Sequence, residues 1–276
     1  MKSPDQQATD KPVTMRALAC LALLITCLVS THPARAGAAC NAAVTTEAAF
    51  TKAMALAVRA RTALDESGAE VALIARVGQD LSGYGLRYSH LAYVWRDHPQ
   101  GRWLVVHELN ECGTARSALF NQGLANFFMD DMFAYDSLIV IPGQDSQHRI
   151  AAMLGSTTAL AMHAPGYNML SYAWSDRYQN SNQWVLESYA ASASDTPLTT
   201  RGDAQRWLKA ANFEPITIHV NSLQRLGARA TRANVAFDDH PFNRRMAGQI
   251  DTVTVEAVVA FIQHRDPGAR QLTLRE

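Results

Sequence analysis

Short apolar runs bounded by turn residues predict that most strands lie in the first half of the chain. The runs cover residues 70–76, 89–95, 102–109, 137–142 and 215–220. They are only six to eight residues long and rich in β-branched and aromatic residues, which is typical of strands. The segment RDHPQG separates the second run from the third, so we expect a hairpin with a six-residue loop at 96–101.

Longer segments with helical periodicity or composition predict helices around these strands. They cover residues 45–67, 145–162, 182–192, 200–213 and 254–264. Gly68 is the expected stop of the first, and Asp145 or Ser146 the expected cap of the second. The segment NQGLANFFMDDMF at 121–133 fits either a lid or an ordinary helix packed on the sheet.

The order of these elements predicts one α+β domain, an antiparallel sheet flanked by helices. There is no internal repeat, low-complexity linker or clear break in composition. We expect a core at about 40–195 and a C-terminal extension at about 196–276.

The N-terminal pattern predicts a Sec-type signal peptide over residues 1–36. Arg16 precedes the apolar run 17–29, and the small residues of ARA at 34–36 precede Gly37. We therefore expect cleavage near Ala36, a mature chain 37–276 and a periplasmic or secreted location. The run of 13 residues is short for a membrane span, although an uncleaved anchor is the alternative. The start is either Met1 or Met15.

Composition and charge exclude several classes of protein. The chain has 276 residues, of which 48% are hydrophobic and 18% charged, as in folded globular proteins. Basic and acidic residues number 25 each, so the formal charge is zero and nothing indicates nucleic-acid binding. The phosphate-binding loop, the GxSxG elbow and the HExxH motif are all absent, and the histidines do not cluster. We expect no cofactor and no metal, and we interpret His219 and His240 as surface or loop residues.

The cysteines favour one disulfide. Of four cysteines, Cys20 and Cys27 lie in the predicted signal, which leaves Cys40 and Cys112. Two cysteines in an exported protein most simply pair. The alternative is a catalytic thiol at Cys112, but the adjacent Glu111 would raise its pKa and so disfavours this.

Three residues could carry chemistry. His90 begins one strand, His107 ends the next strand of the hairpin, and Ser181 stands where a polar loop becomes a helix. A helix start favours a developing negative charge, an imidazole accepts the nucleophile's proton, and a third group orients the imidazole. Antiparallel neighbours lie about 5 Å apart, within reach of an imidazole–imidazole contact. The other interpretation of Ser181 is a helix N-cap.

Two resemblances sharpen this prediction. The segments RYSHLAYVW and GRWLVVHEL resemble the hairpin of NlpC-type papain-like amidases, and YQNSNQWVLE resembles the nucleophile motif of their circularly permuted branch. The chain also resembles an uncharacterised family of secreted proteobacterial proteins, through GLRYSH, Cys112, GLANF and YQNSNQW, where that family shows Cys at the position of Ser181.

The resemblance implies a permuted papain-like fold with Ser181 as nucleophile, His90 as base and His107 as orienting group. The expected substrate class is amides such as peptidoglycan peptides. Residues expected to line the pocket or donate to an oxyanion are Tyr178, Asn180, Gln183, Tyr88 and Arg87. Because a serine hydroxyl is far less acidic than a thiol, three states stay open: a live serine site, a dead site and a helix cap. The runner-up function is an inactive papain-like scaffold that binds a ligand or an envelope partner. No oligomeric state is predicted.

Overall fold

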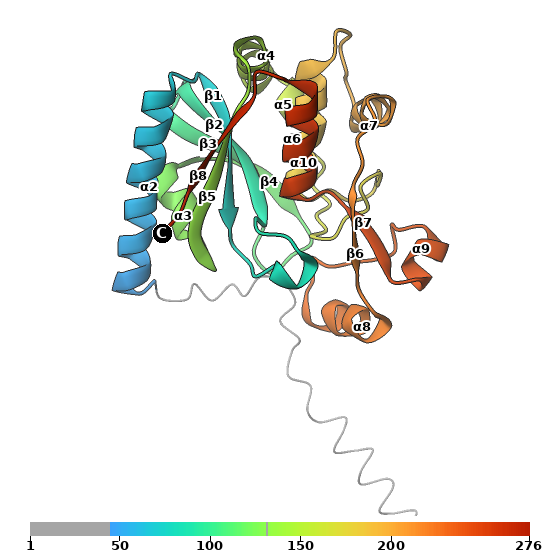
Figure 1. Ribbon diagram of the computed structural model, residues 1–276. Helices are drawn as coiled ribbons and strands as arrows, with labels where there is room; N and C mark the ends of the chain where they lie inside the picture. The colour runs from blue at the N-terminus through green and yellow to red at the C-terminus, as the bar shows by residue number, and fades with distance from the viewer. Residues whose placement is uncertain (1–44, 131) are drawn as a thin grey trace, which may run out of the picture. The chain divides into compact units, whose positions relative to one another are not determined.

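The computed structural model describes residues 45–130 and 132–276 and shows a mixed α+β fold around a six-stranded sheet (Figure 1). Neighbouring strands are all antiparallel, in the order β4-β3-β2-β1-β5-β8. The strands are β1 (Val71–Val77), β2 (His90–His98), β3 (Gly101–Asn110), β4 (Ser117–Gly123), β5 (Ala134–Ile141) and β8 (Arg270–Leu274). The predicted signal peptide and Cys40 lie outside the described residues. The predicted α+β class with an antiparallel sheet flanked by helices is confirmed, and the permuted papain-like architecture stays a prediction.

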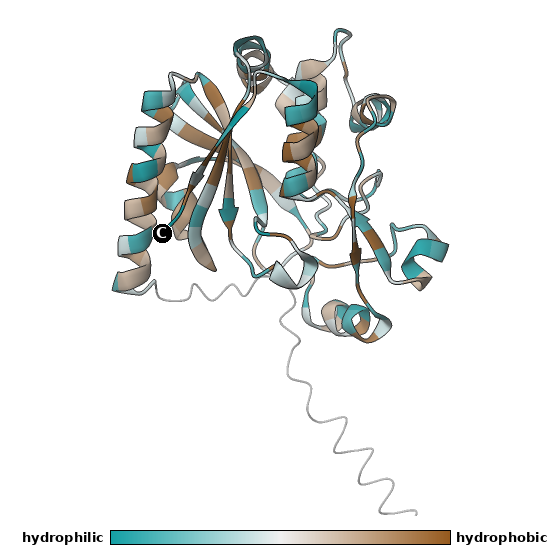
Figure 2. Ribbon diagram, viewed as in Figure 1, coloured by the Kyte–Doolittle hydropathy of each residue, from teal (hydrophilic) through white to brown (hydrophobic). Residues whose placement is uncertain are grey.

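Helices cover both faces of the sheet, because successive strand residues point to opposite sides. Along β1, Leu73 and Ala75 join one core cluster, whereas Ala72 and Ile74 join the other. The second cluster packs under α2 (Glu47–Ser67) and α3 (Leu124–Met129). The helices on the first side are α4 (Gln144–Leu154), α5 (Thr158–Ala161), α6 (Ser181–Ala193), α7 (Arg201–Ala210) and α10 (Val255–Arg265). Figure 2 shows hydrophobic residues along the central strands, between these two sets of helices.

The predicted hairpin is present, but its loop is shorter than expected. Asp97 pairs with Arg102, and His98 pairs with Gly101, so the turn consists of Pro99 and Gln100. The expected six-residue loop was wrong because polar residues on the exposed ends of both strands continue the ladder. Gly101 has a φ of 153°, a backbone conformation that glycine adopts without strain.

The helix predicted at 145–162 is two helices. Gly155 ends α4, and α5 begins at Thr158. Neither Asp145 nor Ser146 caps α4, because Gly143 occupies the N-cap position. Asp266 replaces a local cap, since its Oδ2 accepts the Gly143 N–H at 2.8 Å from far along the chain. The segment at 121–133 contains α3, whose Phe127 and Phe128 are buried on the sheet as in an ordinary helix.

The C-terminal third forms a small unit beside the sheet and then returns to it. The unit comprises β6 (Ile216–His219), α8 (Ser222–Thr231), α9 (Phe242–Met246) and β7 (Gln249–Thr252). Strands β6 and β7 pair with each other around a third core that includes Ile218, Val235 and Ile250. The chain then contributes α10 to the main core and β8 to the sheet edge. Within the described residues, no helix combines the length and apolar character needed to cross a membrane.

Candidate functional site

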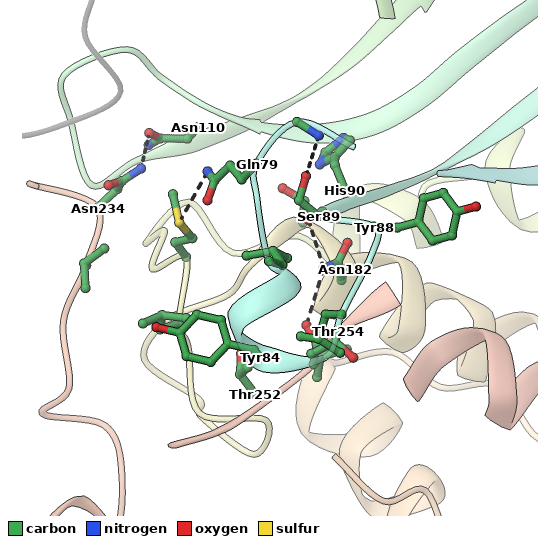
Figure 3. Close-up of a pocket in the computed structure, with 18 of the residues that line it drawn as sticks. Gln79, Tyr84, Tyr88, Ser89, His90, Asn110, Asn182, Asn234, Thr252 and Thr254 are labelled. Carbon is green, nitrogen blue, oxygen red and sulfur yellow. Dashed lines mark hydrogen bonds between the residues drawn. The ribbon is translucent and has the colours of Figure 1, made fainter. Parts of the chain in front are cut away.

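A cavity of about 440 Å³ lies where β2 and α6 both begin. Its lining includes His90 from β2, Ser181 and Asn182 from α6, and Arg76 from the end of β1. Tyr167 lines it from the irregular segment before α6. Figure 3 shows His90 and Asn182 on the same side of this cavity. The fold thus brings two of the three predicted catalytic residues, His90 and Ser181, to one cavity.

Ser181 is the first residue of α6, and Asn180 is the cap. The Asn180 Oδ1 accepts the backbone N–H of Gln183 at 2.8 Å, which satisfies one of the free donors of the first turn. The interpretation of Ser181 as the N-cap was therefore wrong, because the cap function belongs to the residue before it. Ser181 is 5% exposed, so its side chain is enclosed by protein and cavity.

Asn182 fixes the start of α6 against the start of β2. Its Oδ1 accepts the backbone N–H of Leu91 at 2.9 Å, and its Nδ2 donates to the Ser89 carbonyl at 3.4 Å. These two bonds lie on either side of His90 in the chain. The Asn182 side chain therefore ties the start of α6, which carries Ser181, to the start of β2, which carries His90.

The two histidines of the hairpin contact each other. His90 Nε2 lies 2.9 Å from His107 Nδ1, and the exposed fractions of the residues are 8% and 0%. Since the ring nitrogens are hydrogen-bonded, one imidazole donates and the other accepts. The expected imidazole–imidazole contact is present. His107 does not line the cavity but lies behind His90.

Burial and a neighbouring cation keep both imidazoles neutral. Burial and, to a smaller extent, the Arg76 charge together lower the pKa of His107 to about 3 and that of His90 well below its usual value. Arg76 faces His90 across the β1–β2 ladder. Its guanidinium donates to the Phe127 carbonyl at 2.5 Å and to Asp130 Oδ2 at 2.6 Å.

The imidazole of His90 lies on the α3 side of the sheet. Its ring centroid is 5.9 Å from that of Phe127 in α3, whereas Leu91 belongs to the core under α6. Ser181 comes from the α6 side. His90 and Ser181 therefore line the cavity from opposite sides of the end of the sheet. The resemblance to papain-like amidases did not predict this arrangement.

Tyr167 is the residue at this site that the sequence did not reveal. Its hydroxyl lies 3.4 Å from Ser181 Oγ, and burial raises its pKa to about 12, so the phenol stays protonated at neutral pH. It stands in an irregular segment between α5 and α6, positioned by a hydrogen bond from its N–H to the Ala115 carbonyl. No local pattern marks such a residue, because distant backbone sets its place.

Of the five predicted pocket residues, Tyr88 alone lines the cavity. Arg87 is ion-paired with Asp136, and Tyr178 lies under the guanidinium of Arg177. The side chains of Asn180 and Gln183 are engaged inside the protein, Asn180 with Thr252 and Gln183 with Glu187. That Asn180, Gln183 or Tyr178 donates to an oxyanion stays a prediction. The contacts that these side chains make inside the protein are enough to explain their positions.

A buried ion pair holds the loop before α6 in place. Glu187 is 0% exposed, and its carboxylate accepts from Arg201 Nε at 2.7 Å and from Gln179 Nε2 at 2.6 Å. Arg201 also donates to the Ser175 and Tyr178 carbonyls, both at 3.1 Å. Burial raises the pKa of Glu187, and Arg201 opposes this. The pair therefore connects α6, α7 and the segment that carries Tyr167.

The remaining predicted features have simple outcomes. Cys112 is disulfide-bonded, and the other three cysteines of the chain all precede the described residues, so the pairing with Cys40 stays a prediction. Across residues 45–130 and 132–276, no group of three or more His, Cys, Asp or Glu side chains is arranged to hold a metal ion. His219 is exposed at the end of β6, and His240 lies in the loop before α9 as predicted, although it is buried beside Asp239 and not at the surface.

These features define an α+β protein with a cavity at the end of an antiparallel sheet, lined by a buried histidine and a serine at a helix start. The chain belongs to the bacterial family described as "Uncharacterized protein conserved in bacteria (DUF2145)", whose model matches residues 63–262. This stretch contains His90, His107, Tyr167 and Ser181. Comparison with curated proteins and with solved structures gave no match.

Proposed function

We propose that this protein is an exported hydrolase that cleaves amide or ester bonds with Ser181 as the nucleophile. The observation that carries the proposal is that Ser181 and His90 line one cavity and that Asn182 bonds the segments carrying them. A buried neutral histidine, a serine hydroxyl and a helix N-terminus in one cavity are the parts that nucleophilic acyl transfer requires.

Each group has a role that its environment supports. His90 Nε2 is bonded to His107, which leaves Nδ1 to accept the Ser181 proton as Oγ attacks the carbonyl carbon. The same proton then passes to the leaving amine or alcohol, and water hydrolyses the acyl-serine. The protonated Tyr167 hydroxyl beside Ser181 is the donor available to the oxyanion.

The proposal includes the papain-like arrangement and the periplasmic or secreted location. The hairpin that carries both histidines precedes the helix that carries Ser181, the order of the permuted branch of NlpC-type enzymes. The predicted signal peptide supports export. Peptide amides such as those of peptidoglycan are the substrates that this resemblance favours.

One observation favours a second function. Among the described residues, the hydrogen-bond partner of Ser181 Oγ is the Tyr167 hydroxyl and not a histidine. The low pKa of His90 also makes it a weak base. An inactive scaffold that binds a ligand in the cavity would have this arrangement.

Covalent labelling distinguishes the two functions. We expect a small fluorophosphonate to add one adduct to the mature protein, located at Ser181 by peptide mass. Ser181→Ala should abolish the adduct, and His90→Gln should slow labelling about 100-fold, the usual contribution of a general base. His98→Gln, a change at the far end of the same strand, is the matched control and should label at the wild-type rate.

Two other results would count against the hydrolase. An unlabelled wild type, together with His90-dependent alkylation of Ser181→Cys by iodoacetamide, would overturn the hydrolase and establish the inactive scaffold. If the folded wild type takes no fluorophosphonate and the introduced thiol of a folded Ser181→Cys variant is not alkylated, both functions would be overturned.

A further inference from the structure

The cavity has a second part with a different chemistry. Its lining includes an apolar wall formed by Leu86, Met169, Leu170, Ile218, Ala228 and Val235. These residues come from the loop after β1, the segment before α6 and the small C-terminal unit. Three separate segments thus contribute apolar side chains to one side of the cavity.

The apolar wall is a preformed surface. Ile218 and Val235 belong to the third core, with exposed fractions of 6% and 7%, and the other four wall residues pack against that core. A wall supported by a core keeps its shape without a ligand, which reduces the entropy that a ligand must lose on binding.

The wall runs from the catalytic residues to the far side of the cavity. The Met169 carbonyl accepts from Asn180 Nδ2 at 3.5 Å, one residue before Ser181. At the other end, Asn234 donates to Asn110 at 3.0 Å, and Figure 3 shows this pair across the cavity from His90. Val235 follows Asn234 in the chain. A ligand on the wall can therefore reach Ser181 at one end.

One charge of the cavity lining is left for a ligand. The lining contains four charged residues: Arg76, Asp80, Asp130 and Arg232. Arg76 and Asp130 are paired with each other, and Asp80 accepts from the backbone and hydroxyl of Ser82. Arg232, exposed at the end of α8, forms no ion pair with any described residue. Its guanidinium is free to bind an anionic group.

We propose that the apolar wall and Arg232 bind an acyl chain that ends in a carboxylate. The methylene groups lie along the wall, and the carboxylate pairs with Arg232. The assignment of the chain as the acyl part of a Ser181 substrate rests on the proposed function, whereas the binding itself does not. The substrate class is then an amide or ester of a medium-length acyl chain with a terminal anionic group.

Displacement of a fluorescent fatty acid, 11-(dansylamino)undecanoate, from the mature protein tests the binding. We expect saturable binding that decanoate reverses and acetate does not, because acetate lacks the apolar body. Decan-1-ol should displace the probe more weakly, because it lacks the charge.

Matched variants on α8 test each half of the site. Arg232→Gln should weaken probe binding roughly two- to fivefold, the range for one exposed ion pair. Arg229→Gln removes the same charge from an exposed position of the helix outside the cavity and should bind as wild type. Ala228→Phe fills the cavity and should reduce affinity at least about tenfold. Ala230→Phe, on the exposed side, is its control, and circular dichroism checks that all variants fold.

The outcomes separate this inference from the proposed function. Equal losses in Arg232→Gln and Arg229→Gln, or no saturable binding, would overturn the site even if Ser181 reacts with a small fluorophosphonate. Binding that depends on Arg232 and Ala228 and persists in Ser181→Ala would support it even if Ser181 labels with nothing. A decyl fluorophosphonate that labels Ser181 no faster than the methyl compound would contradict the assignment of the chain as the acyl part.

Discussion

At the scale of single residues, Glu108 is the least satisfied group near the candidate site. It is 0% exposed, and neither carboxyl oxygen has a hydrogen-bond partner among the described residues. The nearby hydroxyl of Ser117 is instead bonded to His163 Nε2 at 3.1 Å. Burial raises the pKa of Glu108 to about 8. The Glu108 side chain is therefore a neutral carboxylic acid at pH 7. It destabilises the folded state only at higher pH, where the buried carboxyl must ionise.

We predict that Glu108→Gln stabilises the protein at alkaline pH and has little effect at pH 5. Between about 4.5 and about 8 the folded state keeps a proton that the unfolded state has released. The free energy of unfolding therefore falls as the pH rises through this window, by about 1.4 kcal/mol for each unit of pKa difference at most. Urea unfolding at pH 5 and pH 8.5 measures this. The exposed Glu66→Gln is the control, and an equal effect of Glu108→Gln at both pH values would contradict the prediction.

The His90–His107 pair gives a second prediction about single residues. Both pKa values are lowered, that of His107 to about 3, so neither ring should gain a proton between pH 8 and pH 5. We expect two imidazole signals in proton–carbon NMR spectra that do not shift over this range. His90→Gln and His107→Gln assign them. A titration midpoint above pH 6 for either imidazole would contradict this prediction, because it would show that water reaches the histidine pair more than in the structure.

At the scale of elements, the start of α6 depends on contacts far along the chain. Its cap is local, at Asn180, but the loop before it is held by the Glu187–Arg201 pair from α6 and α7. The side chains of Glu187 and Arg201 are 1% and 10% exposed. A buried charge without its partner is costly, so this pair controls whether Ser181 and Tyr167 keep their places.

We predict that Arg201→Met lowers the free energy of unfolding by about 3–5 kcal/mol, because the buried Glu187 carboxyl loses its cationic partner. Arg206→Met removes an ion pair with Asp203 on the same helix, where the arginine is 73% exposed, and should cost less than about 1 kcal/mol. Urea denaturation measures both. Adding Glu187→Gln to Arg201→Met should recover part of the loss, and its failure to do so would contradict the ion-pair explanation.

The strands that the sequence predicted are those with a compact apolar run. The runs of β1 and β2 are mostly apolar and buried, and the pairing of the hairpin strands β2 and β3 predicted that His107 lies beside His90. Strands β4 and β8 were missed because they are half-exposed and their sequences, SALFNQG and RQLTL, show little apolar pattern. At the site, local spacing predicted the histidine contact and the helix start. Tyr167 was missed because its place depends on backbone contacts that no local pattern records.

At the scale of the whole molecule, the C-terminal residues complete the main sheet. The predicted extension after about residue 196 contains α10, whose Val258 and Ile262 are fully buried, and β8, which pairs with β5. Leu272 and Leu274 of β8 pack on the core under α2. The chain therefore leaves the sheet, builds the unit that contributes Ile218, Ala228 and Val235 to the apolar wall, and returns to close the sheet edge.

Because the chain leaves the main sheet and returns to it, we predict that the main sheet and the small C-terminal unit unfold together. Removing residues 269–276 takes away β8, exposes the edge of β5 and uncovers apolar area worth about 3 kcal/mol. We therefore expect a melting temperature about 6–12 °C lower and more aggregation through the exposed edge. Removing only residues 275–276 deletes the exposed Lys52–Glu276 ion pair and should change the melting temperature little. Tryptophan fluorescence, which arises from five residues that all lie outside the β6–β7 unit, and far-ultraviolet circular dichroism should report one transition at the same temperature in each protein. A first transition that leaves the tryptophan signal unchanged would instead show that the C-terminal unit unfolds alone, and its three wall residues would then separate from His90 and Ser181.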